Sequence, residues 1–473
     1  MMILNKIIFF ILVTFLFSEC PNMHEEYNDQ CYFNDDINFL NALLQNSCID
    51  YDDDGEYGVV ECVLNNSMDT NQDGIFHPTE IGVQVWENNR LLILDCNWDD
   101  NSSNCQLAGP IPFNVDNATE LKILDLGNND LMGGIPQEIT HLSNLEELSL
   151  GSNDLGGNIP EELNELNNLK YFYIENNNIS GALPDSFYEL SELIEINISY
   201  NQITTELNKN ICLLENLENL LINNNQITGS LPSCIDLMIG LTYINASSNS
   251  ISGNIPQGIG SLLNIEYLIL NNNNITGEIP TTIINLPSIK VIQLNNNNIS
   301  GNIPLDIDNL TTLEYLILDN NLLTGTIPVN IGNLINLVEL NLYANQFSGW
   351  IPLSIEEIGS LDKFWVGENQ MTGIIPQFMT YLESYSVYDN LFCPPYPSSI
   401  VLGYQNTSEC IEYMQGNLNQ DTILDILDII IGVNLIVNNV ELDSYQYWSL
   451  DIDGNGSHNI NDIIYLVQII MYH

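Results

Sequence analysis

Apolar and polar residues recur at a fixed spacing between about residues 90 and 392. Each repeat carries an asparagine, with an apolar residue two positions later and others five and three positions earlier, as Leu268 and Leu270 precede Asn273. A glycine usually stands four positions after the asparagine and a proline seven positions after it, as Gly277 and Pro280 do. The stretch LNNNNITGEIP is therefore one turn of a repeat and not a polar low-complexity tract. The asparagines follow one another every 24 residues: Asn129, Asn153, Asn177, Asn201, Asn225, Asn249, Asn273, Asn297, Asn321, Asn345 and Asn369.

This period is typical of a solenoid, in which one unit cannot bury its apolar face alone and stacked units bury a continuous core. The alternating apolar pair predicts a short strand with two inward side chains. The asparagine amide both donates and accepts, so we expect it to satisfy backbone groups that the turn leaves unpaired. The proline cannot continue a strand ladder. The repeat at Asn201 departs from the pattern, because Thr205 and Asn208 replace the glycine and the proline.

The repeat closely resembles the plant-type leucine-rich repeat, whose pattern is LxxLxLxxNxLxGxIP. The resemblance covers about residues 90 to 392. It implies an α/β leucine-rich repeat solenoid with short parallel strands on the concave face and irregular or 3-10 segments on the convex side.

The outward strand positions lie six and four residues before each periodic asparagine. Aromatic and aliphatic residues fill many of them, and exposed patches of that kind commonly mark binding sites. Tyrosine and isoleucine also simply suit strands. A peptide and a glycan both remain open as ligands, because tyrosine and tryptophan faces serve either. The predicted ligand-binding residues are Tyr171, Tyr173, Tyr243, Tyr267, Ile269, Tyr315, Ile317 and Trp365.

The chain of 473 residues is strongly acidic, with seven Lys and Arg, 62 Asp and Glu, and a formal net charge of −55. Such a charge repels nucleic acid and anionic membrane surfaces, so we expect no nucleic-acid partner. Cations are the natural counterpart. Solubility in salty surroundings is a second explanation, because screening shortens the repulsion to about 8 Å at physiological ionic strength.

The N-terminus predicts export. Lys6 precedes an apolar run from Ile7 to Phe17, which is too short to cross about 30 Å of hydrocarbon. We therefore expect a signal peptide over residues 1–18 and a secreted or cell-surface protein without a membrane span. Cys20 leaves a lipoprotein anchor as an alternative, although Glu19 stands where that signal favours a small residue.

The ten cysteines agree with export. Cys212 and Cys234 lie four and two residues after the equivalent positions Asn208 and Pro232, side by side on the convex face of adjacent repeats, which predicts a disulfide there. Cys105 stands at the ladder position, 24 residues before Asn129, so a free thiol is the alternative to a bridge with Cys96. The cysteines lie in neighbouring pairs: Cys20 and Cys31, Cys48 and Cys62, Cys96 and Cys105, Cys212 and Cys234, Cys393 and Cys410.

The N-terminal flank carries a loop with the spacing of calcium ligands. The sequence DTNQDGIFHPTE from Asp69 to Glu80 matches the EF-hand loop, with Gly74 at the sharp turn. The match implies calcium ligands at Asp69, Asn71, Asp73, Ile75 and Glu80. An acidic turn without metal is the alternative. The upstream loop DYDDDGEYGVVE has the same skeleton, with candidate ligands at Asp50, Asp52, Asp54 and Glu61.

The C-terminal flank holds a duplication offset by 34 residues, NLNQDTILDILD and DIDGNGSHNIND, each followed by an apolar segment with helical character. Paired calcium loops of this kind resemble a dockerin. The resemblance implies ligands at Asn417, Asn419, Asp421, Asp425 and Asp428, and at Asp451, Asp453, Asn455, Asn459 and Asp462. A cohesin is the partner that it implies. The positions that select a cohesin are apolar here (Ile426, Leu427 and Ile460, followed by Asn461), which argues for another docking partner.

Four regions follow from these patterns: residues 1–18, a capping region with an EF-hand-like loop at 19–88, the solenoid at 89–412 and a small all-α calcium-binding module at 413–473. The sequence contains no GxSxG, zinc or phosphate-loop motif, so we expect no enzyme. We predict an exported recognition or scaffold protein that docks through its C-terminal module with calcium as cofactor, in the setting of a polysaccharide-degrading complex. A structural adhesin whose C-terminal module serves for capping or sorting is the alternative.

Overall fold

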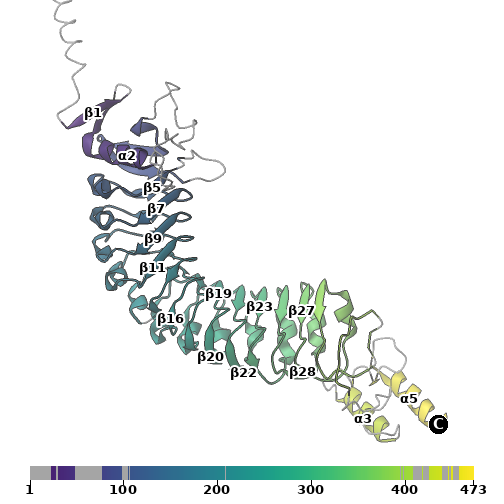
Figure 1. Cartoon of the computed structure of the whole chain (residues 1–473). Helices are drawn as coiled ribbons and strands as arrows, with labels where there is room; N and C mark the ends of the chain where they lie inside the picture. The colour runs from purple at the N-terminus through teal and green to yellow at the C-terminus, as the bar shows by residue number, and fades with distance from the viewer. Residues whose placement is uncertain are drawn as a thin grey trace, which may run out of the picture. The chain divides into compact units, whose positions relative to one another are not determined.

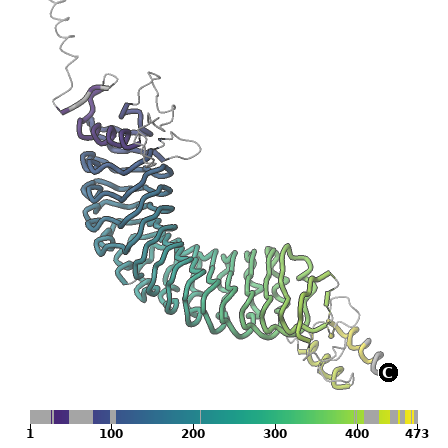
Figure 2. The backbone as a smooth tube through the Cα atoms, in the orientation of Figure 1, coloured from purple at the N-terminus to yellow at the C-terminus, as the bar shows by residue number. Residues whose placement is uncertain are grey.

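The computed structural model describes residues 23–27, 30–47, 77–97, 105, 107–207, 209–394, 396–397, 399–407, 418, 426–438, 446, 449–450 and 458–472 (Figures 1 and 2). It divides into two compact units. The first unit comprises Met1–Glu206 with Asn210–Ile227, and the second comprises Leu207–Lys209 with Thr228–His473. The predicted signal peptide lies outside the described residues.

The first unit begins with a small cap. Strand β1 (His24–Tyr27) pairs antiparallel with β2 (Gln30–Phe33), and helix α2 (Asn34–Asn46) follows at once. The apolar residues Ile37, Phe39, Leu40 and Leu43 of α2 are at most 1% exposed, because they recur on the helix face that meets the first turn of the solenoid. The cap therefore covers the end of the stacked core.

Strand β3 (Val83–Glu87) and β4 (Arg90–Asp95) form an antiparallel hairpin after the short helix η2 (Pro78–Glu80). The turn residues Asn88 and Asn89 have φ angles of 51° and 67°, a region that asparagine adopts more readily than most residues. The hairpin spans the predicted boundary at residues 88 and 89, so the cap and the solenoid share one sheet.

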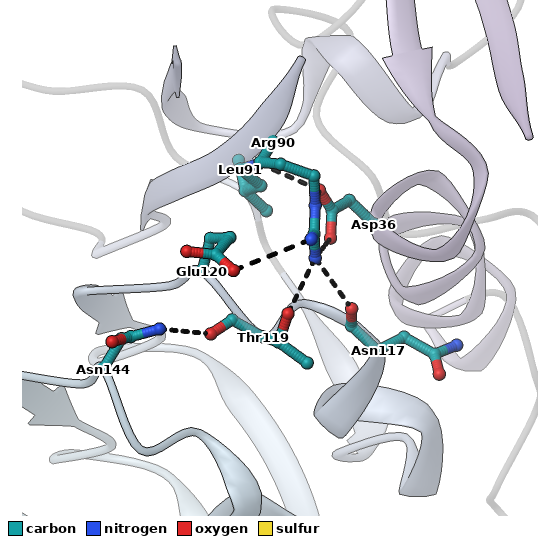
Figure 3. Close-up of polar contacts among 7 residues, drawn as sticks. All are labelled: Asp36, Arg90, Leu91, Asn117, Thr119, Glu120 and Asn144. Carbon is teal, nitrogen blue, oxygen red and sulfur yellow. Dashed lines mark hydrogen bonds and ion pairs between the residues drawn. The ribbon is translucent and has the colours of Figure 1, made fainter. Parts of the chain in front are cut away.

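A buried ion pair joins α2 to this hairpin (Figure 3). The Asp36 side chain is fully buried and accepts hydrogen bonds from Arg90 Nε at 2.8 Å and Arg90 Nη2 at 3.1 Å. Asp36 Oδ2 also accepts the backbone N–H of Leu91 at 2.9 Å. Arg90 Nη2 continues to Thr119 Oγ1 and to the carbonyl of Asn117 in the first solenoid turn. One arginine thus connects the cap helix, the hairpin and the first repeat.

The solenoid of the first unit continues the hairpin as a parallel sheet. The strand order is β3-β4-β6-β8-β10-β12-β15, and each repeat adds one strand and one short 3-10 helix. The sheet strands are β6 (Ile123–Asp125), β8 (Glu147–Ser149), β10 (Tyr171–Tyr173), β12 (Glu195–Asn197) and β15 (Asn219–Leu221). The 3-10 helices are η3 (Phe113–Asn117), η4 (Gln137–His141), η5 (Leu163–Glu165), η6 (Asp185–Glu189) and η7 (Lys209–Leu213), the last of which begins at the division between the units.

A second, smaller parallel sheet follows the asparagine positions of the first unit. It arises because each repeat stays extended for a few residues around the glycine that follows the asparagine, and neighbouring repeats pair there. Its strands are β5 (Ala108–Pro110), β7 (Asp130–Gly134), β9 (Asp154–Asn158), β11 (Asn178–Gly181) and β13 (Gln202–Ile203), and β14 (Glu206–Leu207) lies at the division.

The second unit repeats this architecture (Figure 1). Its larger parallel sheet has the strands β17 (Tyr243–Asn245), β19 (Tyr267–Ile269), β21 (Val291–Gln293), β23 (Tyr315–Ile317), β25 (Glu339–Asn341), β27 (Lys363–Trp365) and β29 (Ser384–Ser386). The smaller strands are β16 (Thr228–Gly229), β18 (Ser252–Asn254), β20 (Asn274–Glu278), β22 (Asn298–Gly301), β24 (Leu322–Leu323), β26 (Ser348–Gly349) and β28 (Gln370–Met371). The 3-10 helices are η8 (Ser233–Leu237), η9 (Gln257–Ser261), η10 (Thr281–Asn285), η11 (Ile307–Asn309), η12 (Val329–Asn333), η13 (Leu353–Glu357) and η14 (Gln377–Tyr381).

The periodic asparagines form the predicted ladder of buried hydrogen bonds. Asn273 is 8% exposed, and its Nδ2 donates to the carbonyls of Ala246 at 2.9 Å and Leu270 at 3.1 Å. Its Oδ1 accepts the backbone N–H of Ile251 in the preceding repeat at 3.0 Å. One side chain therefore ties two successive turns together, and the same contacts recur at Asn297 and Asn321.

Two periodic features lie outside the predicted pattern. The residue before each ladder asparagine has a positive φ, as Asn272 does at 55° and Ala344 at 50°. Asparagine is common there because its side chain tolerates this conformation. A second polar ladder runs along the side of the 3-10 helices, where Asn264, Ser288, Thr312, Asn336 and Ser360 each donate to a carbonyl 25 residues earlier.

The C-terminal region contributes two helices, α3 (Ile426–Val437) and α5 (Ile460–Tyr472). Leu418, Leu450, Ile463 and Leu466 form a small buried core against which α3 packs. A Cβ at Gly432 would lie 2.6 Å from Ile463 Cδ1, so the absent side chain lets the two helices approach closely. A small helical region is therefore present where the sequence predicts one.

The predicted solenoid is confirmed, and so is one of its disulfides. Cys96 and Cys105 are bonded with a Cα–Cα separation of 5.3 Å, which excludes the free ladder thiol. Cys31, Cys212, Cys234 and Cys393 are also disulfide-bonded. None of the helices in the described part of the chain has both the length and the hydropathy of a membrane span.

Candidate ligand-binding surface

The three-residue strands of the larger sheet present two side chains outward and one inward. In β19, Leu268 is fully buried while Tyr267 and Ile269 on either side are partly exposed. The cause is the two-residue period of a strand, which points successive side chains to opposite faces. The outward face of the sheet therefore carries the predicted columns.

In the second unit, tyrosines of adjacent strands stack into an aromatic surface. Tyr243 pairs in register with Tyr267, and their ring centroids are 5.0 Å apart. Val291 follows on β21 and Tyr315 on β23. Burial raises the pKa of the Tyr243 hydroxyl, a hydrogen bond with Asn245 partly offsets this rise, and Tyr267 adds a smaller rise. The tyrosine rings give this surface apolar faces and polar hydroxyl groups.

In the last strands of the second unit, charged side chains lie near an aromatic ring. Lys363 Nζ lies 5.9 Å from the centroid of the Trp365 ring and 3.3 Å from Glu339 Oε2 on the neighbouring strand. Trp365 Nε1 donates to Ser384 Oγ at 3.2 Å. Trp365 thus lies on the outward face, where its ring contacts Lys363 of its own strand and Ser384 of the neighbouring strand.

A tyrosine pair beside Trp365 was not predicted. Tyr343 and Tyr388 lie two residues before their ladder asparagines, and their ring centroids are 5.8 Å apart. The Tyr388 hydroxyl donates to that of Tyr343 at 3.1 Å, and the Tyr343 hydroxyl donates to a Glu368 carboxylate oxygen. Burial and this hydrogen bond raise the pKa of Tyr343. The signal was available in the sequence, because the position two before the asparagine also points outward.

One member of the predicted set is buried. Ile317 is 8% exposed, contrary to the expectation of an open aliphatic column. Its strand neighbours are Gln293 and Asn341, whose polar side chains stand in register on both sides of it. Ile317 therefore supports the face and offers little surface to a ligand.

In the first unit, an aromatic pair lies between carboxylates. The rings of Tyr171 and Tyr173 on β10 are stacked at 6.3 Å. Tyr171 pairs in register with Glu147 on β8 and with Glu195 on β12. Burial raises the pKa of Tyr173, and the negative charges of Glu195 and Glu147 raise it further. The surroundings of this pair thus differ from those in the second unit by their concentrated negative charge.

The predicted calcium ligands lie largely outside the described residues. Those outside are Asp50, Asp52, Asp54, Glu61, Asp69, Asn71, Asp73, Ile75, Asn417, Asn419, Asp421, Asp425, Asp451, Asp453 and Asn455. The described ones include the last ligand position of three loops, Glu80, Asp428 and Asp462, which are 8%, 0% and 0% exposed. Within the described ranges no three acidic, cysteine or histidine side chains are arranged to hold a metal ion.

Each of the three buried carboxylates accepts a backbone N–H from a residue that precedes it in the chain. Glu80 Oε2 accepts the backbone N–H of His77 at 3.0 Å, three residues before it. Asp462 Oδ2 accepts the N–H of Asn459 at 2.8 Å, also three residues earlier. Asp428 Oδ1 accepts the N–H of Leu418 at 2.7 Å, ten residues earlier and within the predicted loop. Each carboxylate is thus turned toward the loop that precedes its helix.

Comparison with known families agrees with the repeat register. Models of the leucine-rich repeat family match residues 120–142, 144–166, 167–227, 240–262, 264–286, 288–310, 312–334 and 336–358. These segments carry the strands, ladder asparagines and 3-10 helices described above. No match supports a dockerin or an EF-hand. A search of curated proteins gave no match.

Several solved structures are similar to this chain. The plant peptide hormone receptor RGFR1 in complex with RGF2 has 33% identity and a TM-score of 0.63 over 68% of this chain and 56% of the receptor chain. A TDR receptor has 30% identity and a TM-score of 0.57 over 65% and 57% of the two chains. A leucine-rich repeat protein of Leptospira interrogans has 25% identity and a TM-score of 0.52 over 66% and 83%.

The chain spans little more than half the length of the two receptor chains. The similarity therefore concerns the repeat region. The family matches, the asparagine ladder and the register of the parallel strands together show that this chain carries a solenoid of leucine-rich repeats.

Proposed function

We propose that this protein is an exported, non-catalytic recognition protein. It binds an extended peptide along the outward face of its larger parallel sheet. The observation that carries the proposal is the row of partly exposed aromatic residues on adjacent strands, with Tyr243 and Tyr267 in contact. Aromatic side chains supply large contact areas at low cost in conformational entropy. Tyr243, Tyr267 and Tyr315, with Val291 between the last two, span β17 to β23, which suits a ligand that is long and extended.

A peptide fits the comparisons better than a glycan does. The solved structure with 33% identity is a plant peptide hormone receptor in complex with RGF2. Disulfides at Cys96 and Cys105 and elsewhere agree with an extracellular location. That this chain binds a peptide and not a glycan is itself part of the proposal.

The test begins with selection of ligands from a displayed random peptide library on the full-length protein. Replacing Tyr243, Tyr267 and Tyr315 together by serine should lower the affinity of the selected peptides at least about tenfold, because each ring contributes about 1 kcal/mol or more when it is covered. The matched control replaces Tyr381 and Tyr404, which are 78% and 69% exposed, and should leave binding within about twofold.

Two results decide against the proposal. Selected peptides that bind the triple variant as well as the original protein contact another surface. A triple variant that loses its far-UV spectrum shows that these tyrosines belong to the core, and the single variant Tyr315→Ser then repeats the test with a smaller change in packing.

The ends of the chain carry a second part of the proposal, the calcium-binding and docking roles. Asp428 and Asp462 are fully buried and turned toward their loops, which fits the last ligand of a calcium site. Asn459 would join Asp462 in one loop, and Glu80 would close the N-terminal one. When bound, calcium would neutralise these carboxylates and hold each loop against its helix.

The C-terminal module at residues 413–473 also presents an exposed apolar stripe. Ile426, Ile430, Val433 and Val437 recur at helical spacing on α3 and are between 38% and 73% exposed. This supports docking to a protein partner or to a surface through α3. The alternative is an adhesin that uses the module for capping or sorting. The double variant Ile430→Lys with Val433→Lys would abolish docking only if docking occurs through α3.

A further inference from the structure

The first unit carries a composite surface of rings and carboxylates on the outward faces of β8, β10 and β12. Tyr171 and Tyr173 stack on the central strand, and Glu147 and Glu195 stand in register beside Tyr171 on the two flanking strands. Adjacent strands are about 4.8 Å apart, so each carboxylate lies beside the face or the edge of the ring. Glu175, two residues after Tyr173 along the chain, extends the surface.

The carboxylates of this surface repel one another. Burial raises the pKa of Glu147, and the charges of Asp125 and Asp95 raise it further. Burial also raises the pKa of Glu175, with contributions from Asp125 and Glu195. Glu175 Oε2 is buried and has no hydrogen-bond partner in the structure. Asn219 Nδ2 donates to Glu195 Oε2 at 2.9 Å, but the surface is short of positive charge.

Two basic side chains of the first unit are engaged elsewhere, and the charge of a third, Lys122, acts on Glu146. Arg90 pairs with Asp36 and Glu120, and Lys170 pairs with Glu146 at 2.7 Å. In the described part of this unit, no ion pair reaches Glu147, Glu175 or Glu195. A partner can supply a cation to these carboxylates.

The geometry selects the kind of cation. The acidic residues are spread along several strands and do not converge, and no described group of three is arranged for a metal ion. Stacked rings beside carboxylates suit a planar or ammonium cation on a side chain, which gains from the ring faces and from the charges together. A partner with such side chains at regular spacing would follow the row of strands.

We propose that the outward face of β8, β10 and β12 binds an arginine- or lysine-bearing peptide segment, with one cationic side chain over the Tyr171 and Tyr173 rings and between Glu147 and Glu195. This inference rests on the proposed function and names the class of peptide that the first unit takes. Arginine should be preferred over lysine, because its planar guanidinium both stacks on a ring and binds a carboxylate at two points.

The test uses the full-length protein and a short fluorescein-labelled peptide of alternating arginine and glycine, measured by fluorescence anisotropy. Salt at about 150 mM limits the general negative field to about 8 Å. Glu147→Gln together with Glu195→Gln should lower the affinity about fivefold to tenfold. Glu161→Gln together with Glu165→Gln removes the same charge from exposed positions near η5 and should change it less than about twofold.

Tyr171→Leu supplies an independent arm, because it leaves every charge in place. Loss of the ring face should lower the affinity about twofold to fivefold. A peptide of alternating glutamine and glycine should bind at least about tenfold more weakly than the arginine peptide. Circular dichroism and thermal melting establish that each variant is folded.

Three outcomes overturn the inference: equal losses in the two charge-matched double variants, equal binding of the arginine and glutamine peptides, or no effect of Tyr171→Leu. These outcomes are separate from failure of the proposed function. If binding of the library peptides depends on the second-unit tyrosines but binding of the arginine peptide does not depend on the first unit, only the choice of a basic segment is refuted.

Discussion

Asp36 and Arg90 are 54 residues apart in the sequence and form a two-point ion pair, with Asp36 Oδ2 2.8 Å from Arg90 Nε and Asp36 Oδ1 3.1 Å from Arg90 Nη2. The hydrogen bond from the Leu91 N–H to Asp36 makes the same carboxylate a cap for strand β4. The hydrogen bond to the aspartate is the main cause that raises the pKa of Arg90. The pair closes the N-terminal end of the repeat core.

We predict that Asp36→Ala destabilises the cap by about 3 to 5 kcal/mol, because it leaves a partly buried guanidinium and a strand N–H without their acceptor. Asn38→Ala changes an exposed residue of the same helix and should cost at most about 0.5 kcal/mol. Hydrogen exchange of the α2 amides measures both. Equal protection in the two variants would show that the ion pair does not hold the cap.

The ladder predicts a sharp contrast between neighbouring asparagines. Asn273→Ala should destabilise the second unit by about 1 to 3 kcal/mol, because the backbone groups of Ala246, Leu270 and Ile251 lose their partner. Asn274 is exposed, and Asn274→Ala should cost at most about 0.5 kcal/mol. Denaturant unfolding monitored by circular dichroism compares them, and similar midpoints would contradict the ladder assignment.

Asn272 is an unsuitable control for that experiment. Its φ of 55° favours asparagine, so replacement by alanine carries a backbone cost of its own.

Gly82 lies against the disulfide of Cys96 and Cys105, so a side chain at this position would crowd the disulfide. A Cβ at Gly82 would lie 2.3 Å from the Asp95 carbonyl oxygen and 2.7 Å from Cys96 Sγ, and its φ is 55°. Gly157 also has a positive φ, but a Cβ there meets nothing within 4 Å. Gly157→Ala should therefore cost about 1 kcal/mol and Gly82→Ala at least about 2 kcal/mol. Thermal melting of the two variants measures the difference, and a larger shift for Gly157→Ala would refute the close contact.

The raised pKa of Glu175 predicts that the stability of the protein depends on pH. Burial raises its pKa in the folded chain above that of the unfolded chain, so the ionised form is disfavoured on folding. The protein is therefore more stable at a pH below the unfolded-state pKa of Glu175 than at neutral pH. This gain in stability is lost as the pH rises through the folded-state pKa of Glu175. Glu175→Gln should raise the melting temperature at pH 7 by a few degrees, and the gain should shrink toward zero near pH 4. A gain of equal size at both pH values would show that charge is not its cause.

The calcium proposal predicts that EDTA loosens α3 and α5, whose shared core is small. Binding energy should appear as folding energy in a module of this size. Asp451→Ala should reduce hydrogen-exchange protection of α5 more than Asn417→Ala reduces that of α3, because Asp451 supplies a charged ligand and Asn417 does not. Identical protection in EDTA and in millimolar calcium would refute the metal sites.

The repeat architecture could be predicted because its causes are local. A 24-residue period, an apolar pair in strand alternation and an amide at one fixed position specify each turn, and each turn meets only its neighbours. The outward positions of Tyr171, Tyr267 and Trp365 followed from the same count. Pairing of Cys96 with Cys105 was one of two alternatives, because spacing alone cannot show whether a thiol at a ladder position faces another.

Tertiary structure decided the features that join residues far apart or depend on neighbours. The sequence alone offers no period that relates Asp36 to Arg90, so only folding of α2 against the β3–β4 hairpin shows the pair. Burial of Ile317 depends on the side chains of adjacent strands, and the crowding around Glu175 depends on carboxylates brought together from separate repeats. Periodicity thus determined the scaffold and the direction of its side chains, whereas exposure and charge at each position were set by contacts between repeats.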